Sequence, residues 1–193
     1  MKKLASTALL SLSAFALNAQ AEPAKFGGIS FGSTVTEIEY ANSTDNTNDF
    51  SDNADAASTY SLTFGLKDRT FRLYMDASYE NNEIANTGIL TFNADYIFPV
   101  MNKAGLFAGA SIGHAAINWD TDNELVMQSN LDGNSDDSFV YGGKIGAIYT
   151  IMPKADIELG FRQIYSNLKS EEGDVTLSAE ESAHTYMGLS YTF

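Results

Sequence analysis

The chain has 193 residues, with 25 acidic against 11 basic side chains, a net charge of −14 and no cysteine. Its length fits one compact domain, and the lack of cysteine excludes disulfides, cysteine-ligated metal sites and a thiol nucleophile. The acidity excludes binding of nucleic acid through a basic face. The content of 15 Gly, 3 Pro and 12% aromatic residues is typical of an all-β protein.

Residues 1–21 have the three-part pattern of a cleaved secretory signal peptide. Met1-Lys2-Lys3 is positive, the run from Leu4 to Leu17 is apolar apart from small Ser and Thr, and Ala19-Gln20-Ala21 offers a cleavage site. A membrane-spanning helix is the alternative, but the run is too short to cross about 30 Å of hydrocarbon. We therefore predict a signal peptide over residues 1–21 and one folded domain over residues 22–193.

Downstream of this segment, apolar side chains alternate with polar or very small ones. This alternation predicts strands, because successive side chains of a strand point to opposite faces. In residues 71–80, for example, Phe71, Leu73 and Met75 interleave with Arg72 and Asp76. The predicted strands, in chain order, cover residues 25–40, 60–66, 71–80, 89–98, 105–117, 139–150, 156–162 and 187–193.

The connections between these strands alternate between long and short. The short ones cover residues 67–70, 99–104 and 151–154. The long ones cover residues 41–58, 81–87, 118–137 and 166–183. An up-and-down meander then has all short turns at one end and all long loops at the other, which is typical of bacterial outer-membrane barrels. We therefore predict an all-β fold, an eight-stranded antiparallel up-and-down transmembrane β-barrel.

Periodicity alone leaves open a soluble, lipocalin-like barrel, which would turn its apolar face inward. Three features favour an apolar face that points outward. Aromatic residues near the strand ends would form girdles at two lipid–water boundaries. The polar face is rich in Gly, Ser and Thr, as the narrow lumen of an eight-stranded barrel requires. The last residue, Phe193, is in phase with the apolar face.

The segment His184-Thr-Tyr-Met-Gly-Leu-Ser-Tyr-Thr-Phe193 resembles the terminal strand of Gram-negative outer-membrane β-barrels. Residues 105–114 and 156–162 are similar to strands of the small OmpA/OmpX-like barrels. The resemblance implies a monomer in the bacterial outer membrane, surrounded by lipid and lipopolysaccharide. It also implies that the barrel-assembly machinery recognises a signal that includes Tyr191 and Phe193. Because the pattern ends with the eighth strand, we expect no peptidoglycan-binding domain of the OmpA type.

Strand phase places six charged side chains on the polar side, three of each sign. They are Arg72, Asp76, Asp95, Lys144, Glu158 and Arg162. Buried charges persist when they are paired and hydrogen-bonded, so we predict an interior ion-pair network that plugs the barrel. A gate that opens to pass small ions is the alternative. Asp156 and Glu80 are expected nearer the rims, in contact with water.

The long connections carry 16 of the 25 acidic residues and one basic residue, Lys169. Such an acidic rim could bind lipopolysaccharide through divalent cations, contact a basic partner, or simply be a solvated surface. The segment Asp120-Thr-Asp122-Asn-Glu124 lacks the glycine and the distal glutamate of a calcium loop. We therefore predict no metal site.

The two histidines offer little for catalysis, because an activated nucleophile needs a base within reach. His114 is expected on the lipid side and His184 near the loops. Neither is followed two residues later by the Ser of the His-x-Ser arrangement of lipid A deacylase barrels. We predict no enzymatic activity and no cofactor. The expected role is that of a structural or surface-interaction protein, and the alternatives are a narrow gated channel and a lipid-modifying enzyme.

Overall fold

The computed structural model describes residues 23–42, 50–53, 56–81, 85–119, 135–172 and 175–193. The predicted signal peptide, residues 1–21, lies outside this range. None of the described residues forms a helix long and apolar enough to cross a membrane. The strands of the described residues are β1 (Ala24–Asn42), β2 (Phe50–Asn53), β3 (Ala57–Lys67), β4 (Phe71–Asn81), β5 (Ala85–Met101), β6 (Ala104–Trp119), β7 (Ser135–Met152), β8 (Ala155–Glu172) and β9 (Val175–Thr192).

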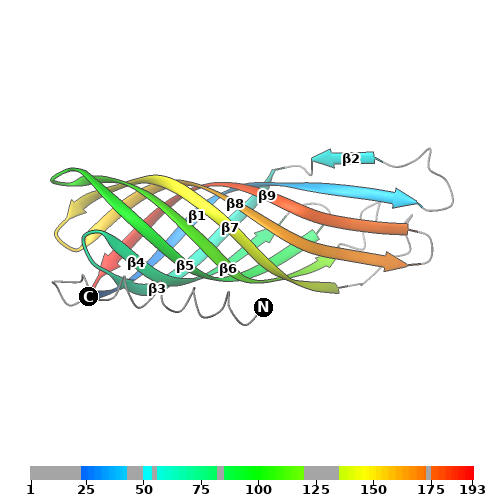
Figure 1. Ribbon diagram of the computed structural model, residues 1–193, viewed down its shortest axis with the longest axis horizontal. Helices are drawn as coiled ribbons and strands as arrows, with labels where there is room; N and C mark the ends of the chain where they lie inside the picture. The colour runs from blue at the N-terminus through cyan, green and yellow to red at the C-terminus, as the bar shows by residue number, and fades with distance from the viewer. Residues whose placement is uncertain (1–22, 43–49, 54–55, 82–84, 120–134, 173–174) are drawn as a thin grey trace, which may run out of the picture.

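Eight of these strands form a closed barrel (Figure 1). From β3 to β9 each strand pairs antiparallel with the next, and β1 closes the ring by pairing with both β3 and β9. The predicted eight-stranded antiparallel up-and-down barrel is confirmed. We call the end that carries the short connections 68–70, 102–103 and 153–154 the turn end, and the opposite end the loop end.

The loop end has more strand than the sequence pattern predicts. The short strand β2 lies in a segment expected to be a loop, and it pairs with β1 beyond Thr34, where the pairing of β1 with β3 stops. The connection expected over residues 166–183 is also largely strand, because β8 runs to Glu172 and β9 begins at Val175. Long-range pairing extends these strands through polar sequence that has no clear periodicity of its own.

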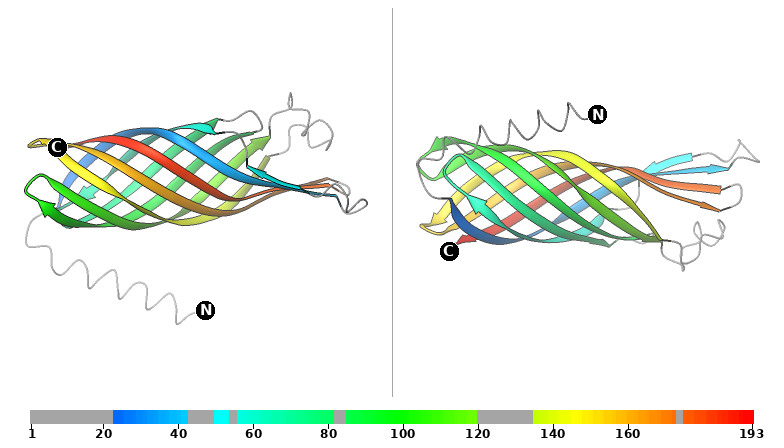
Figure 2. Two further views of the ribbon diagram at one scale, coloured as in Figure 1. Left: turned by 90° about the horizontal axis from the view of Figure 1, so that it is seen from above. Right: turned by 60° about the horizontal axis from the view of Figure 1, so that its bottom comes forward.

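Part of the sheet therefore projects beyond the rest of the barrel. A tilted strand needs about 9–11 residues to cross a membrane. β3 and β4 have 11 residues each, whereas β1 has 19 and β7, β8 and β9 have 18 each. Figures 1 and 2 show β1, β8 and β9 reaching past the other barrel strands at the loop end. Bulges between Glu37 and Ile38 and between Tyr165 and Leu168 lie where they leave the barrel.

The outer face of the barrel is apolar from the turn end to beyond its middle. Leu62, Phe64 and Ile145 are 66%, 60% and 61% exposed. A soluble monomer does not present a continuous apolar surface of this kind to water, whereas hydrocarbon accepts it. The apolar face thus points outward, as predicted, and the barrel spans a membrane.

Aromatic side chains gather on the outer face at two heights. At the turn end the rings of Tyr191 and Phe193 lie 5.7 Å apart, edge to face. Towards the loop end the rings of Tyr141 and Tyr165 stack at 5.6 Å. This arrangement agrees with the girdles that mark the two lipid–water boundaries of membrane barrels. It also places the two residues of the predicted assembly signal on the outside of the barrel, at the turn end.

Candidate functional site

The polar lumen gathers all six charged residues that the strand phase predicts for it. Five of them are buried, and Glu158 is half-buried. The structure joins them into two groups of ion pairs: Arg72, Lys144, Asp95 and Glu158 form the group nearer the turn end, and Arg162 and Asp76 form the other.

In the first group, the Arg72 guanidinium lies between two carboxylates from different strands. Its Nη2 lies 2.6 Å from Asp95 Oδ2, and its Nη1 lies 2.5 Å from Glu158 Oε2. Asp95 belongs to the neighbouring strand β5, whereas Glu158 projects from β8 on the far side of the lumen. Arg72 therefore bridges the interior of the barrel, and its charge is compensated twice.

Aromatic rings surround the same guanidinium. Arg72 Cζ lies 4.7 Å from the ring centroid of Phe107 and 5.4 Å from that of Tyr74, within the range of cation–π attraction. Phe26 packs edge to face on Tyr74 at 5.7 Å. Phe26 and Phe107 are both buried, so at this height the lumen holds aromatic rings as well as the Gly, Ser and Thr residues expected there.

Glycines make room for these rings. A Cβ added at Gly146 would lie 2.5 Å from Phe107 Cζ, and one added at Gly160 would lie 2.5 Å from the Tyr186 hydroxyl oxygen. Such contacts are too close to exist without movement of the ring. The glycines predicted to face the lumen thus leave space for large side chains from the neighbouring paired strands instead of leaving an open pore.

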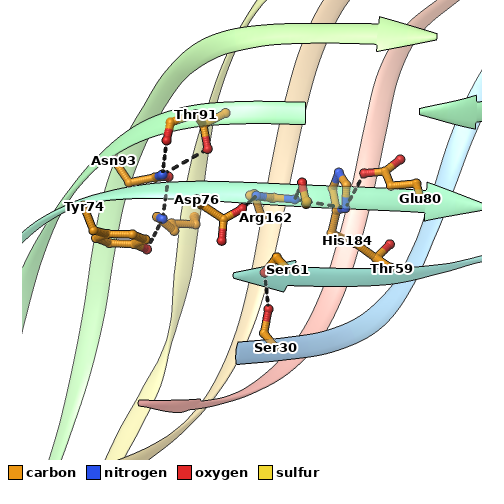
Figure 3. Close-up of polar contacts among 12 residues, drawn as sticks. Ser30, Thr59, Ser61, Tyr74, Asp76, Glu80, Thr91, Asn93, Arg162 and His184 are labelled. Carbon is orange, nitrogen blue, oxygen red and sulfur yellow. Dashed lines mark hydrogen bonds and ion pairs between the residues drawn. The ribbon is translucent and has the colours of Figure 1, made fainter. Parts of the chain in front are cut away.

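Lys144 connects the first group to neutral polar residues. Its ammonium donates to Asn93 Oδ1 at 2.7 Å and to the Tyr74 hydroxyl, which in turn donates to Asp95 Oδ2 at 3.0 Å. Figure 3 labels Tyr74 and Asn93, the two residues that accept from the Lys144 ammonium. Each donor has an acceptor, which is the condition under which charge is tolerated in a dry interior.

The second group lies nearer the loop end. Arg162 Nη1 donates to Asp76 Oδ1 at 3.1 Å, and Nη2 lies 3.5 Å from His184 Nδ1 (Figure 3). The same imidazole nitrogen lies 2.7 Å from Thr34 Oγ1 and 3.2 Å from Glu80 Oε1. His184, expected near the loops, is instead a buried member of the lumen network, because its strand β9 continues through residues that were read as loop.

Two acidic residues expected to contact water are also buried and paired. Glu80 faces His184, as described above. Asp156 lies at the turn end, where its Oδ2 is 2.5 Å from Lys67 Nζ and its Oδ1 accepts from the Thr150 hydroxyl at 2.7 Å. The sequence reading missed Lys67 because it falls at the boundary between a predicted strand and a predicted turn. It missed Tyr74 and Asn93 as partners because neither carries a charge.

Above the polar network, towards the loop end, the lumen becomes apolar. Ile89, Ile117, Val140, Ile164 and Leu168 are all buried there, together with Ala57, Ala85 and Ala115. At about this height, the outer face begins to carry polar side chains. On the outside, His114 Nδ1 lies 3.9 Å from Asp137 Oδ2 and both side chains are exposed, and Gln163 donates to Glu181.

The polarity of the barrel therefore inverts along its axis. Below the inversion it is polar inside and apolar outside, as lipid requires. Above it the lumen is mainly apolar, and polar side chains such as His114, Asp137 and Gln163 appear on the outer face beside the exposed rings of Phe139, Tyr141 and Tyr165. We call this upper part the collar, defined by the buried residues Ile89, Ile117, Val140, Ile164 and Leu168. The inversion marks the height at which the hydrocarbon ends.

Little space remains inside. The cavity in the polar network, which touches Arg72, His184 and Tyr186, measures about 40 Å³, and the cavity in the collar measures about 20 Å³. These volumes admit no more than a few water molecules. A larger cavity of about 890 Å³ opens at the turn end, below the Lys67–Asp156 pair.

Among the described residues, no cluster of three or more His, Asp or Glu side chains could hold a metal ion. The segment from Asp120 to Glu124 and most of the acidic residues of the long connections lie outside the described residues. His114 lies on the outer face, as predicted, and its ring contacts that of Phe139 edge to face at 6.3 Å.

No family model and no curated protein sequence matches the chain. Several solved structures do match. Neisserial surface protein A (NspA) has a TM-score of 0.57 and 15% identity over 86% of this chain and 97% of its own. Outer membrane protein H (OprH) of Pseudomonas aeruginosa has a TM-score of 0.53 and 24% identity over 88% and 99%. The N-terminal β-barrel domain of OprF from the same species has a TM-score of 0.52 and 11% identity over 89% and 100%.

These similarities are similarities of fold. The expected likeness to small outer-membrane barrels is confirmed at that level. Together, the fold and the lipid-facing exterior are those of a β-barrel of the bacterial outer membrane.

Proposed function

We propose that the protein is a sealed outer-membrane barrel with a structural and surface-interaction role, which it performs by holding its external connections above the membrane. The observation that carries this proposal is the filling of the lumen. Between the turn-end cavity and the loop end, the spaces around the central charges and the collar are about 40 and 20 Å³. Ions with their hydration shells need a continuous path, and cavities of this size do not provide one.

Two different regions of the lumen block the passage of ions. The lower barrier is ionic: Arg72 is held by Asp95 and Glu158 from opposite sides of the lumen, and removal of one partner from a buried pair is costly. The upper barrier is the collar, whose buried Ile89, Ile117, Val140, Ile164 and Leu168 leave a cavity of about 20 Å³, too small for a hydrated ion. A narrow gated channel would have to rearrange both.

The collar also supports the role in surface contact. It has a mainly apolar lumen and carries polar side chains among the aromatic residues of its outer face, so we infer that it stands at the outer edge of the lipid as a rigid base for the connections between strands. Sixteen of the 25 acidic residues fall in the connections predicted for this end. Their expected partners are basic surfaces, or anionic lipopolysaccharide bridged by divalent cations.

The placement of the histidines supports a role without catalysis. His184 is enclosed in the lumen, where a lipid substrate has no access. His114 is accessible beside Asp137, but the hydrogen bonds of the described residues bring no hydroxyl group to its ring. Mass analysis of lipid A tests this point: cells with and without the protein should have the same acyl composition. A change that disappears with His114→Ala would establish a lipid-modifying enzyme.

Conductance in planar bilayers tests the seal. The wild-type protein should give no steady current steps, and Arg72→Ala or Arg162→Ala alone should give none while the collar stays closed. A variant that combines Arg72→Ala and Arg162→Ala with Ile117→Ala and Ile164→Ala, and so removes both barriers, should give them. Steady steps from the wild-type protein would support the narrow channel instead.

Binding by the external connections has a separate test. Protein in lipid nanodiscs should bind lipopolysaccharide in the presence of Mg²⁺, and EDTA should reverse the binding. A variant that lacks residues 120–134, which contain four acidic residues, should bind more weakly. Equal binding by this variant and the wild type, or binding that EDTA leaves unchanged, would contradict cation-bridged contact through this connection.

A further inference from the structure

The turn end of the lumen is a wide vestibule, in contrast to the filled interior above it. Its volume of about 890 Å³ is that of a typical small-molecule site. In an outer-membrane barrel the short turns face the periplasm, so the vestibule opens to that compartment. The Lys67–Asp156 ion pair, at 2.5 Å, lies among its walls and is itself nearly buried.

The wall of the vestibule has polar and apolar parts of similar extent. Residues from the ends of β1, β5, β6 and β7 and from the turns between strands line its apolar part. These residues are Ala24, Ile97, Pro99, Ala104, Gly105, Ile148 and Pro153. Ile97 is 8% exposed and Ile148 is half-buried, so the wall is a concave extension of the barrel interior and not part of the surface that contacts lipid.

Two cationic side chains stand at the rim of this cavity. Arg69 comes from the β3–β4 turn and Lys103 from the β5–β6 turn, and both line the vestibule and are exposed. Among the ion pairs of the described residues, none includes either side chain. The acids that line the vestibule already have partners: Asp156 pairs with Lys67, and Asp68 Oδ1 accepts from the Thr70 and Phe71 amides.

The charge at this end is opposite to that of the whole chain. The net charge of the protein is −14, yet the turn end carries Lys25, Arg69, Lys103 and Lys154 in exposed positions. Of these four, Arg69 and Lys103 line the vestibule and the other two do not. The rim therefore presents local positive charge next to the apolar part of the wall around Ile97 and Ile148, and this combination matches an anionic amphiphile.

We propose that the vestibule binds a single-chain anionic amphiphile from the periplasmic side. Its carboxylate or phosphate group pairs with Arg69 and Lys103, and its acyl chain contacts the apolar wall around Ile97 and Ile148. A free fatty acid and a lysophospholipid share this chemistry. The site is separate from the sealed lumen and from the external connections, so it does not depend on the proposed surface role.

The test uses the full barrel in nanodiscs of zwitterionic lipid, observed by NMR of backbone amides. Decanoate and lysophosphatidylglycerol are titrated separately, with methyl decanoate as the uncharged counterpart. Saturable shifts at Arg69, Ile97 and Lys103 with either anionic ligand, and none at these positions with the ester, are expected. The ligand that binds more tightly identifies the preferred head group. Equal responses to decanoate and its ester, or no saturable shifts with either anion, would overturn the proposal.

Two matched double variants distinguish binding in the vestibule from nonspecific attraction of the anion to the positively charged turn end. Arg69→Gln with Lys103→Gln removes the two rim charges and should weaken binding about tenfold, since each exposed ion pair contributes modestly. Lys25→Gln with Lys154→Gln removes two charges from the same end but outside the vestibule, and should leave the affinity within about twofold of wild type. An unchanged affinity in the first variant, or an equal loss in both, would contradict the assigned site.

Discussion

Arg72 and Asp95 lie directly opposite each other on the paired strands β4 and β5, and their side chains meet inside the barrel. Asp95 Oδ2 accepts from Arg72 Nη2 at 2.6 Å and from Nε at 3.1 Å. The same carboxylate also accepts from the Tyr74 hydroxyl and lies 3.5 Å from Lys144 Nζ. One fully buried carboxylate thus organises three donors from two strands.

Asp95→Asn should destabilise the barrel more than any exposed carboxylate-to-amide change. The substitution leaves the positive charges of Arg72 and Lys144 in the interior without this counter-charge, and the loss of one partner of a buried pair costs about 3–5 kcal/mol. Urea unfolding in phospholipid vesicles, followed by the change in gel mobility, measures the difference in free energy of unfolding.

The matched control is Asp137→Asn, because the side chain of Asp137 is 80% exposed on the outer face. It should change the free energy of unfolding by no more than about 0.5 kcal/mol. Equal effects of the two substitutions would mean that the Asp95 carboxylate is not the organising group of the lumen.

Gly109 is predicted to be intolerant of a methyl group. A Cβ at this position would lie 2.7 Å from the Ala94 carbonyl oxygen and would collide with the Asp95 carboxylate. Gly109→Ala should therefore cost about 1–3 kcal/mol, the usual range for overpacking. Gly88→Ala is the control, because nothing lies within 4 Å of its added Cβ. A smaller loss of unfolding free energy for Gly109→Ala than for Gly88→Ala would show that the lumen has free space at this level.

The contact between Glu80 and His184 is predicted to be energetically coupled. Glu80 Oε1 lies 3.2 Å from His184 Nδ1, and both side chains are buried. A double-mutant cycle with Glu80→Ala and His184→Ala should give a coupling energy of about 0.5–3 kcal/mol. In the control cycle, Glu80→Ala is combined with Ser190→Ala near the turn end, and the two effects should add within about 0.5 kcal/mol. Additive effects in the first cycle would argue that the imidazole and the carboxylate do not support each other.

Strand phase was the part of this fold that could be predicted from the sequence. The positions of Arg72 and Asp76 inside the barrel follow from a period of two residues, which is a local property of the chain. The contacts between side chains within the lumen could not be predicted in this way. Phe107 lies beside Arg72 because Gly146 on the next strand leaves room for its ring, and that relation depends on register between strands.

The collar could not be predicted for a related reason. Val140 and Ile164 are apolar and point inward, which contradicts the rule that the lumen of a membrane barrel is polar. They lie at the level of the Tyr141–Tyr165 stack, where polar side chains begin to appear on the outer face, and the sequence carries no direct mark of that boundary. Strand extent was underestimated for β8, whose polar residues near Glu172 pair with β9 above the membrane.

The height of the boundary gives the last prediction. Ala110 and Ala116 lie on the outer face of the same strand, β6, and both are exposed, but Ala110 lies below the inversion and Ala116 above it. Ala110→Arg should reduce the free energy of unfolding in vesicles by about 2–4 kcal/mol, because it places a cation against the middle of the hydrocarbon. Ala116→Arg should cost no more than about 1 kcal/mol, because the position beside the exposed His114–Asp137 pair is already hydrated. Each variant serves as the control for the other, since residue type, strand and exposure are the same. If both substitutions prove equally costly, the lipid reaches above His114, and the collar is part of the membrane-spanning barrel and does not stand above it.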